Sequence, residues 1–190
     1  ITAEELARRL RRDSDYYAAC SGGVTFSGGE PLMQGSFLLE MLALIPEMHT
    51  CIETSGYAPE VLFNKVVEQL DYVIMDIKVF DRELHRAYTG VDNTVILKNA
   101  KRLCSGGTPF TIRIPLIPGV NDNDENLRQT AQWIAGAKKL EKVELLTYQK
   151  TAGAKYCMLG REYQPGFNVE WPVHAAQDIF EEYGIRSSVL

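Results

Sequence analysis

The chain has 190 residues, of which 45% are hydrophobic and 24% are charged, and its formal net charge is −5. These proportions are those of an ordinary globular protein with a core of its own, and the negative charge argues against a nucleic-acid surface, because phosphate binding needs a positive field. No apolar run reaches the ~18 residues that a membrane span requires, and no signal-peptide pattern opens the chain.

Four cysteines lie far apart along the chain: Cys20, Cys51, Cys104 and Cys157. Their spacing matches no metal-ligand or redox pattern, so the sequence predicts no metal ligands in this chain. We interpret them as reduced thiols, which indicates a cytoplasmic protein.

Short β-type runs alternate with helical runs along the chain. A capping box at Thr2 and Glu5 predicts a first helix. Further helices are expected over residues 36–47, from Pro59 onward, over 92–103, after 121–124 and over 173–183, and a short segment of no assigned type runs through 84–88. Strands are expected over 24–26, 50–54, 72–79, 110–117 and 143–148, with an edge strand over 187–190. Because no hairpin dipeptides join them, the strands should be parallel, in either a doubly wound or a barrel-like sheet.

Ionisable and polar side chains stand at the ends of the predicted strands. Glu53 ends one strand, Asp76 and Lys78 end another, Arg113 lies in a third, and Tyr148-Gln149 close a fourth. In parallel α/β proteins ligands bind at the carboxyl ends of the strands. A structural interpretation is an Asp76–Lys78 ion pair, since a charge in such a sheet is costly unless it is paired or used. Ionisable groups on successive strands favour a polar binding cleft instead.

The tetrapeptide Gly28-Gly29-Glu30-Pro31 directly follows the first predicted strand. A structural interpretation is a tight turn with the proline starting a helix. A functional interpretation is that glycines expose backbone C=O and N–H groups to the polar head of a ligand. Glu30 would then add an acceptor for an ammonium group.

Residues 24–32 resemble the glycine-rich motif of radical S-adenosylmethionine (SAM) enzymes, in the form found in glycyl-radical-enzyme activases of the pyruvate formate-lyase activating enzyme type. The likeness extends from residue 1 to about 163. It continues through Glu53-Thr54-Ser55-Gly56-Tyr57, Met75-Asp76-Ile77-Lys78, 85–91, 112–121 and 144–148.

The resemblance implies how the amino end of SAM is held. Gly28, Gly29 and Glu30 would bind the amino group of its methionine moiety, and Pro31 would fix the turn. Glu53 takes the place of an acidic residue near that amino group. Thr54 and Ser55 stand beside it.

The resemblance also assigns the rest of the ligand. Asp76 would face the ribose or a nearby monovalent cation, and Lys78 would bind the methionine carboxylate. Lys78 and Arg113 are the residues expected to be catalytic, because both line the cavity in which SAM reacts. Pro115 and Tyr148 would lie near the adenine, and Gln149 stands where the family often has a histidine.

The implied fold is a partial TIM-like (β/α) barrel, with about five parallel strands of a radical SAM (β/α)6 core, as a single unit over residues 1–190. The family's CxxxCxxC triad, which ligates three irons of a [4Fe–4S] cluster, normally lies upstream of Gly28, and this sequence contains no such triad. We therefore expect a core fragment without the cluster-binding strand and loop, which is inactive alone.

The intact parent is expected to generate a 5′-deoxyadenosyl radical that installs a glycyl radical on a partner enzyme, with flavodoxin or ferredoxin as reductant. Two alternatives remain open. One is a cluster-free module that binds a nucleoside or a protein loop. The other is a barrel lyase with Lys78 as a Schiff-base nucleophile, which Asp76 disfavours because it keeps the lysine charged.

Overall fold

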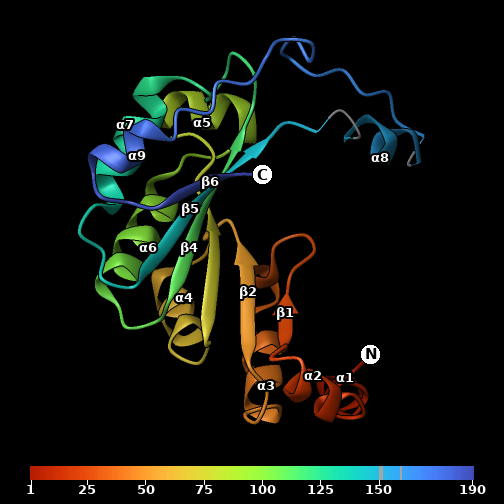
Figure 1. Ribbon diagram of the computed structural model, residues 1–190. Helices are drawn as coiled ribbons and strands as arrows, with labels where there is room; N and C mark the ends of the chain where they lie inside the picture. Colours follow the sequence, from red (N-terminus) through yellow and green to blue (C-terminus); the bar gives the residue numbers. More distant parts are fainter. Residues whose placement is uncertain (150–151, 159) are drawn as a thin grey trace.

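The computed structural model describes residues 1–149, 152–158 and 160–190. In this part of the chain six parallel strands form one sheet, in the order β1-β2-β3-β4-β5-β6 (Figure 1). A doubly wound sheet would reverse its strand order at one point, whereas this order is sequential, so the barrel-like alternative is confirmed. The strands are β1 (Val24–Phe26), β2 (Thr50–Thr54), β3 (Tyr72–Asp76), β4 (Phe110–Leu116), β5 (Leu140–Thr147) and β6 (Ser187–Val189).

The helices are α1 (Ala3–Arg11), α2 (Ser14–Ala19), η1 (Pro31–Gln34), α3 (Gly35–Leu44), α4 (Glu60–Val67), α5 (Arg82–Thr89), α6 (Thr94–Ser105), α7 (Asp124–Ile134), α8 (Ala152–Met158) and α9 (Asp178–Glu182). The predicted capping box of the first helix is confirmed, since the backbone N–H of Glu5 donates to Thr2 and that of Thr2 donates to Glu5. Helices α4, α6, α7 and α9 pack along the outer side of the sheet, whereas α8 lies away from it on the other side (Figure 1).

The core lies between the sheet and these helices. Alternate residues of the central strands point into it, among them Val73 and Met75 of β3 and Ile112 of β4, which are fully buried. From the helices, Phe63 and Leu103 join the same cluster. Each such side chain contributes about 1.5–3 kcal/mol when buried. The carboxyl ends of the strands are thereby held as one rigid edge.

The structure confirms the predicted sheet and corrects two expected boundaries. The sheet of the described residues has six strands: the five expected ones and the expected edge strand, which forms β6 beside β5. Strand β3 ends at Asp76, so Lys78 lies just beyond the strand. The last helix, α9, is shorter than the expected 173–183. Helix α2 was not predicted from the sequence, because it has no apolar stripe, and accordingly none of its residues is buried.

No described helix is both long enough and apolar enough to cross a membrane.

Candidate functional site

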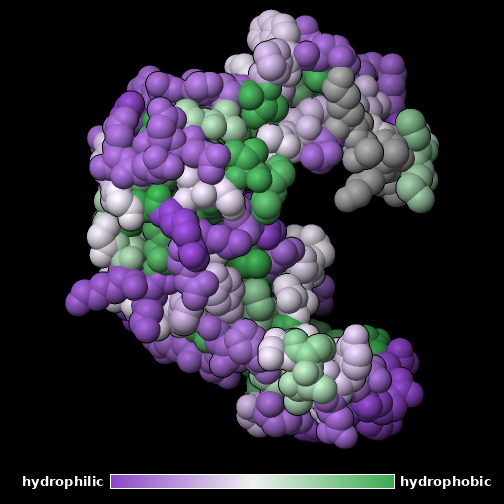
Figure 2. Space-filling view, in the orientation of Figure 1, coloured by the Kyte–Doolittle hydropathy of each residue, from purple (hydrophilic) through white to green (hydrophobic). Residues whose placement is uncertain are grey.

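A polar cavity of about 300 Å³ opens at the carboxyl ends of the strands. Figure 2 shows the molecule hollowed on the side turned away from α6, α7 and α9. Parallel strands bring their carboxyl ends to one edge, which is why residues so far apart in the sequence meet here. The lining residues are Ser27, Gly28, Gly29, Glu30, Glu53, Thr54, Ser55, Asp76, Lys78, Arg113 and Leu146.

A larger cavity of about 620 Å³ adjoins the polar one, and Leu146 lines both. It contains the predicted residues Pro115, Tyr148 and Gln149, together with aromatic side chains from the segment after α8. The phenol oxygens of Tyr148 and Tyr163 lie 2.7 Å apart and form a hydrogen bond. This cavity therefore offers flat apolar walls, as a nucleoside base requires.

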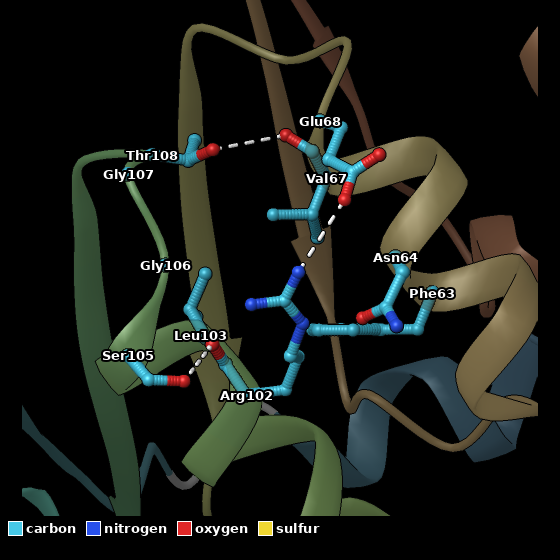
Figure 3. A pocket seen from close by; sticks show the side chains of 10 residues that line it. All are labelled: Phe63, Asn64, Val67, Glu68, Arg102, Leu103, Ser105, Gly106, Gly107 and Thr108. Carbon is cyan, nitrogen blue, oxygen red and sulfur yellow. Dashed lines mark hydrogen bonds and ion pairs between the residues drawn. The ribbon is translucent and has the colours of Figure 1, made fainter.

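A further cavity, of about 290 Å³, lies at the opposite end of the sheet (Figure 3). It is formed where α4 and α6 end and the chain turns back toward the next strand. Arg102 pairs with Glu68 at 3.4 Å, and the Thr108 hydroxyl donates to the Val67 carbonyl at 3.0 Å. Residues at this end of (β/α) sheets serve stability rather than binding. We therefore place the functional site at the carboxyl end.

The glycine loop after β1 leaves room for close approach by a ligand. A Cβ atom added at Gly28 or Gly29 would meet no described atom within 4 Å. Gly28 has a φ of +113°, a conformation that residues with a side chain rarely adopt. The open space and the exposed backbone C=O groups fit an ammonium group. Pro31 begins η1 directly behind this loop and so fixes its exit, as the sequence predicted.

Glu30 ties the glycine loop to the end of β2. Its Oε1 accepts hydrogen bonds from the Thr54 hydroxyl at 2.6 Å and the Leu32 N–H at 3.2 Å. Its Oε2 accepts from the N–H and the hydroxyl of Ser55, at 2.8 and 2.6 Å. A carboxylate has about four acceptor positions, and these described groups fill them. Glu30 therefore fixes the loop, and the acceptors available to an ammonium group are the loop's backbone carbonyls and the other carboxylates that line the cavity.

Arg113 is the centre of an ion-pair network that crosses the sheet. Its Nη1 lies 3.0 Å from Glu53, and its Nη2 lies 2.9 Å from Glu144. Glu53 also accepts a hydrogen bond from Ser27 at 2.7 Å, and these bonds from Ser27 and Arg113 lower the pKa of Glu53. Burial opposes the charge on Glu144, but hydrogen bonds from Lys142 and Arg113 outweigh it and lower its pKa. Both carboxylates are therefore ionised at neutral pH, and Arg113 is held by them.

Asp76 and Lys78 contribute the remaining charges. Lys78 Nζ lies 3.7 Å from Asp76 Oδ2, and the lysine side chain is 44% exposed. Burial raises the pKa of Asp76, and the nearby cations Lys78 and Arg113 offset only part of that effect. The ion pair expected from the sequence is present, but it is long and leaves the lysine ammonium available to a ligand.

Replacing Asp76 with asparagine is expected to stabilise the free chain by about 1 kcal/mol at pH 7. Because the folded pKa of Asp76 is raised, its ionised form is less favourable in the fold than in the unfolded chain, and the amide removes that cost. Urea denaturation at pH 7 measures the gain. A loss of stability would mean that the ion pair with Lys78 outweighs burial.

The donor set fits a zwitterionic amino acid joined to a nucleoside. Backbone carbonyls and carboxylates suit its ammonium group, Lys78 suits its carboxylate, and the adjoining cavity suits a base. The described residues do not provide ligands for an iron–sulfur cluster, because they contain no group of three His, Cys, Asp or Glu that could hold a metal ion. Cys20 and Cys157 are exposed, and Cys51 and Cys104 are partly buried, each as a free thiol.

In the polar cavity and its ion-pair network, sequence reasoning missed three residues: Ser27, Glu144 and Leu146. In the adjoining cavity it missed, among others, the aromatic residues Tyr163 and Phe167. Ser27 directly precedes the glycine motif and could have been found from that position. A charged residue within a strand, such as Glu144, is interpreted as facing solvent unless its partner is known, which here is Arg113 on the neighbouring strand. Leu146 carried no signal, because an apolar residue in a strand indicates only a core position.

A sequential parallel (β/α) sheet with this cleft defines a barrel-type α/β protein that binds a small charged ligand. The chain belongs to the radical SAM superfamily, whose family model matches residues 1–131. This family implies SAM and a [4Fe–4S] cluster as cofactors.

The chain is similar to activating enzymes of several kinds. It is 38% identical to the 4-hydroxyphenylacetate decarboxylase activating enzyme of Clostridioides difficile (strain 630), over 99% of this chain and 61% of that protein. It is 37% identical to the (2S)-3-sulfopropanediol dehydratase activating enzyme of Klebsiella oxytoca, over 86% of this chain and 53% of that protein. The chain thus spans little more than half the length of these curated relatives.

Among solved structures, a domain of the pyruvate-formate lyase-activating enzyme from Bacteroides vulgatus ATCC 8482 is similar, with a TM-score of 0.71 and 29% identity. The match covers 89% of this chain and 99% of that domain. The Streptococcus suis protein SuiB bound to S-adenosylmethionine has a TM-score of 0.68 at 16% identity, over 100% of this chain and 44% of SuiB, which supports the fold alone. The predicted fold is confirmed.

Proposed function

We propose that this chain is the SAM-binding part of a glycyl-radical-enzyme activase. The observation that carries the proposal is the joining of a glycine loop, Lys78 and an apolar cavity at one edge of the sheet. This arrangement gives the amino group, the carboxylate and the adenine of SAM separate partners. Family membership and the similarity to named activating enzymes support it.

In this proposal the chain's residues bind and orient SAM. The carbonyls of Gly28 and Gly29 accept from the ammonium group, while Glu30 holds their loop in place. Lys78 binds the carboxylate, and Arg113 keeps Glu53 ionised beside the ammonium group. Pro115, Tyr148 and Gln149 hold the adenosine. When bound, SAM would supply a carbon-centred radical for hydrogen-atom abstraction, formed when one electron from the reduced cluster breaks its sulfur–carbon bond and methionine is released.

The ligands of the cluster would not be among the described residues, because these contain no group of three His, Cys, Asp or Glu side chains that could hold a metal ion. The partner would be a glycyl radical enzyme, and the electron donor a flavodoxin or a ferredoxin. Free thiols and a net charge of −5 support a cytoplasmic protein without nucleic-acid or membrane partners.

Replacing Gly29 with alanine is expected to weaken SAM binding about tenfold or more while leaving stability within about 1 kcal/mol. The added methyl meets no described atom within 4 Å, so the fold accepts it, but it occupies the space into which the ammonium group must come. Isothermal titration calorimetry with SAM measures the affinity of the chain. Denaturant titration measures its stability.

The matched control is Gly107→Ala, at the opposite end of the sheet (Figure 3). An added Cβ there also meets no described atom within 4 Å, so the two variants differ only in place. We expect Gly107→Ala to bind SAM like the wild type. Equal SAM affinity in Gly29→Ala and the wild type would contradict the proposed site.

A further inference from the structure

The segment that follows β3 leaves the sheet at the point where Lys78 begins. Residues 77–80 belong to no helix or strand. The N–H of Ile77 still donates to the carbonyl of Arg113 in β4, at 3.0 Å, and beyond it the segment leaves the sheet. Buried backbone groups must find other partners, because leaving them unpaired costs free energy. Here the partners are three buried asparagine side chains, which we call the asparagine clamp: Asn93, Asn121 and Asn126, each at most 6% exposed.

Asn121 joins the segment after β3 to the end of β4. Its Nδ2 donates both to the carbonyl of Lys78 and to the carbonyl of Pro115, the latter at 2.7 Å. Its Oδ1 accepts from the backbone N–H of Ile117 at 2.6 Å. One amide therefore fixes the backbone of Lys78 relative to the strand that carries Arg113 and Pro115.

Asn93 and Asn126 hold the next residues. The Nδ2 of Asn93 donates to the carbonyls of Val79 and Phe80, at 3.0 and 2.6 Å. The Oδ1 of Asn126 accepts from the N–H of Phe80 at 2.7 Å, and its Nδ2 donates to the carbonyl of Asn121 at 2.9 Å. The three amides thus form one connected network, in which each satisfied bond strengthens its neighbours.

The side chain of Lys78 is, by contrast, held weakly. It is 44% exposed, and its ion pair with Asp76 is 3.7 Å long. A flexible side chain of this kind reaches a ligand from wherever its backbone places it. The position of the ammonium group in the cleft is therefore set by the clamp rather than by contacts of its own.

We propose that Asn121, supported by Asn93 and Asn126, is a positioning residue for Lys78 and so for the carboxylate of the ligand. This inference rests on the proposed function, because it takes SAM as the ligand. It assigns the asparagines no contact with SAM. Their effect on binding must therefore pass through Lys78.

A double-mutant cycle with Lys78→Ala and Asn121→Ala tests this dependence. Isothermal titration calorimetry on the chain measures the affinity for SAM and for 5′-methylthioadenosine, which has the adenosine and the sulfur but lacks the amino acid group. We expect Asn121→Ala to weaken SAM binding about tenfold when Lys78 is present and less than about twofold in the Lys78→Ala background. Binding of 5′-methylthioadenosine should change less than about twofold in every variant.

The matched control is Asn99→Ala. Asn99 is also fully buried, and its Nδ2 donates to two carbonyls, those of Gly56 and Ala58, in the loop after β2. Removing this side chain also deletes hydrogen bonds to two buried carbonyls, but none of them belongs to the segment that carries Lys78. We therefore expect any effect of Asn99→Ala on SAM affinity to be the same with and without Lys78.

Equal tenfold losses by Asn121→Ala in both backgrounds, or equal losses for SAM and 5′-methylthioadenosine, would overturn the inference and leave a merely structural role. If Asn121→Ala does not fold, Asn93→Ala takes its place in the cycle, with an expected loss of about threefold that also vanishes without Lys78. A wild-type chain that binds neither molecule would overturn the proposed function itself. If the wild-type chain binds SAM but the effects of Lys78→Ala and Asn121→Ala on its affinity simply add, only the positioning role of the asparagine clamp would be overturned.

Discussion

Replacing Glu30 with alanine is expected to lower the free energy of unfolding by about 3 kcal/mol and to abolish measurable SAM binding. The side chain accepts hydrogen bonds from Leu32, Thr54 and Ser55, and it is partly shielded from solvent. Removing it leaves these donors without an acceptor, and bonds to a charged group are worth about 1.5–3 kcal/mol each. Urea denaturation measures the loss of stability, and calorimetry the loss of binding.

Glu30→Gln separates the two effects of this change. Glutamine keeps the length of the side chain and one acceptor oxygen, but its amide group opposes the donors of Ser55. We expect a smaller loss of stability than in Glu30→Ala, together with weaker SAM binding, because the glycine loop shifts. As a control, Glu47→Ala removes a carboxylate from an exposed pair with Arg11 and should leave SAM binding unchanged. Unaltered stability in Glu30→Ala would show that the loop is held by other contacts.

Most of the sheet could be predicted from the sequence, because its signals are local. The runs at Thr50–Thr54 and Phe110–Leu116 are rich in apolar and β-branched residues and end in turn residues, and β2 and β4 form there. Parallel pairing followed from the lack of hairpin turns. The end of β3 could not be predicted, because the apolar residues Ile77 and Val79 continue its pattern although the strand ends at Asp76.

The site was predictable as a set of residues but not as a network. Parallel strands place their carboxyl ends side by side, so Glu53, Asp76 and Arg113 had to meet at one edge. The sequence did not indicate that Arg113 is shared between Glu53, two strands away on β2, and Glu144 on the neighbouring strand β5, because pairing across strands depends on their register.

The roles of Asn121 and Asn123 likewise could not be told apart from the sequence. Residues 121–124 were predicted as helix caps, and Asn123 does cap α7 through the N–H of Asn126. Asn121, two residues earlier, instead binds the carbonyl of Lys78 on another strand's exit segment. Both residues have the same side chain in the same local context. Only the three-dimensional arrangement distinguishes a cap from a clamp, since Lys78, which Asn121 binds, lies 43 residues away in the sequence.

Replacing Arg113 with methionine is expected to lower the free energy of unfolding by about 2 kcal/mol at pH 7. Methionine keeps the apolar stem of the side chain but removes the guanidinium, whose pKa the carboxylates of Glu53 and Glu144 raise even though burial opposes its charge. The Glu144 carboxylate, only 9% exposed, would then retain Lys142 as its cationic partner among the described residues. Breaking such a pair costs more than an exposed pair is worth, because a buried charge loses its compensation.

The pH dependence of this loss identifies its cause. In the wild type, the pKa values of Glu53 and Glu144 are lowered, so their ionisation stabilises the fold above the unfolded pKa of about 4.3, and this contribution disappears as the pH falls through the folded values. Without Arg113 its share of that contribution is missing, while Ser27 and Lys142 keep theirs. The difference between variant and wild type should therefore stay constant from pH 7 to about pH 5 and shrink as the pH falls through the folded pKa values, below about 4.3. Urea denaturation across this range measures the difference. Arg128→Met is the control, since Arg128 pairs with Glu182 at the surface and its removal should change stability little at any pH. A loss in Arg113→Met that stays constant even well below the unfolded pKa of about 4.3 would show that packing of the arginine, rather than its charge, holds this part of the site.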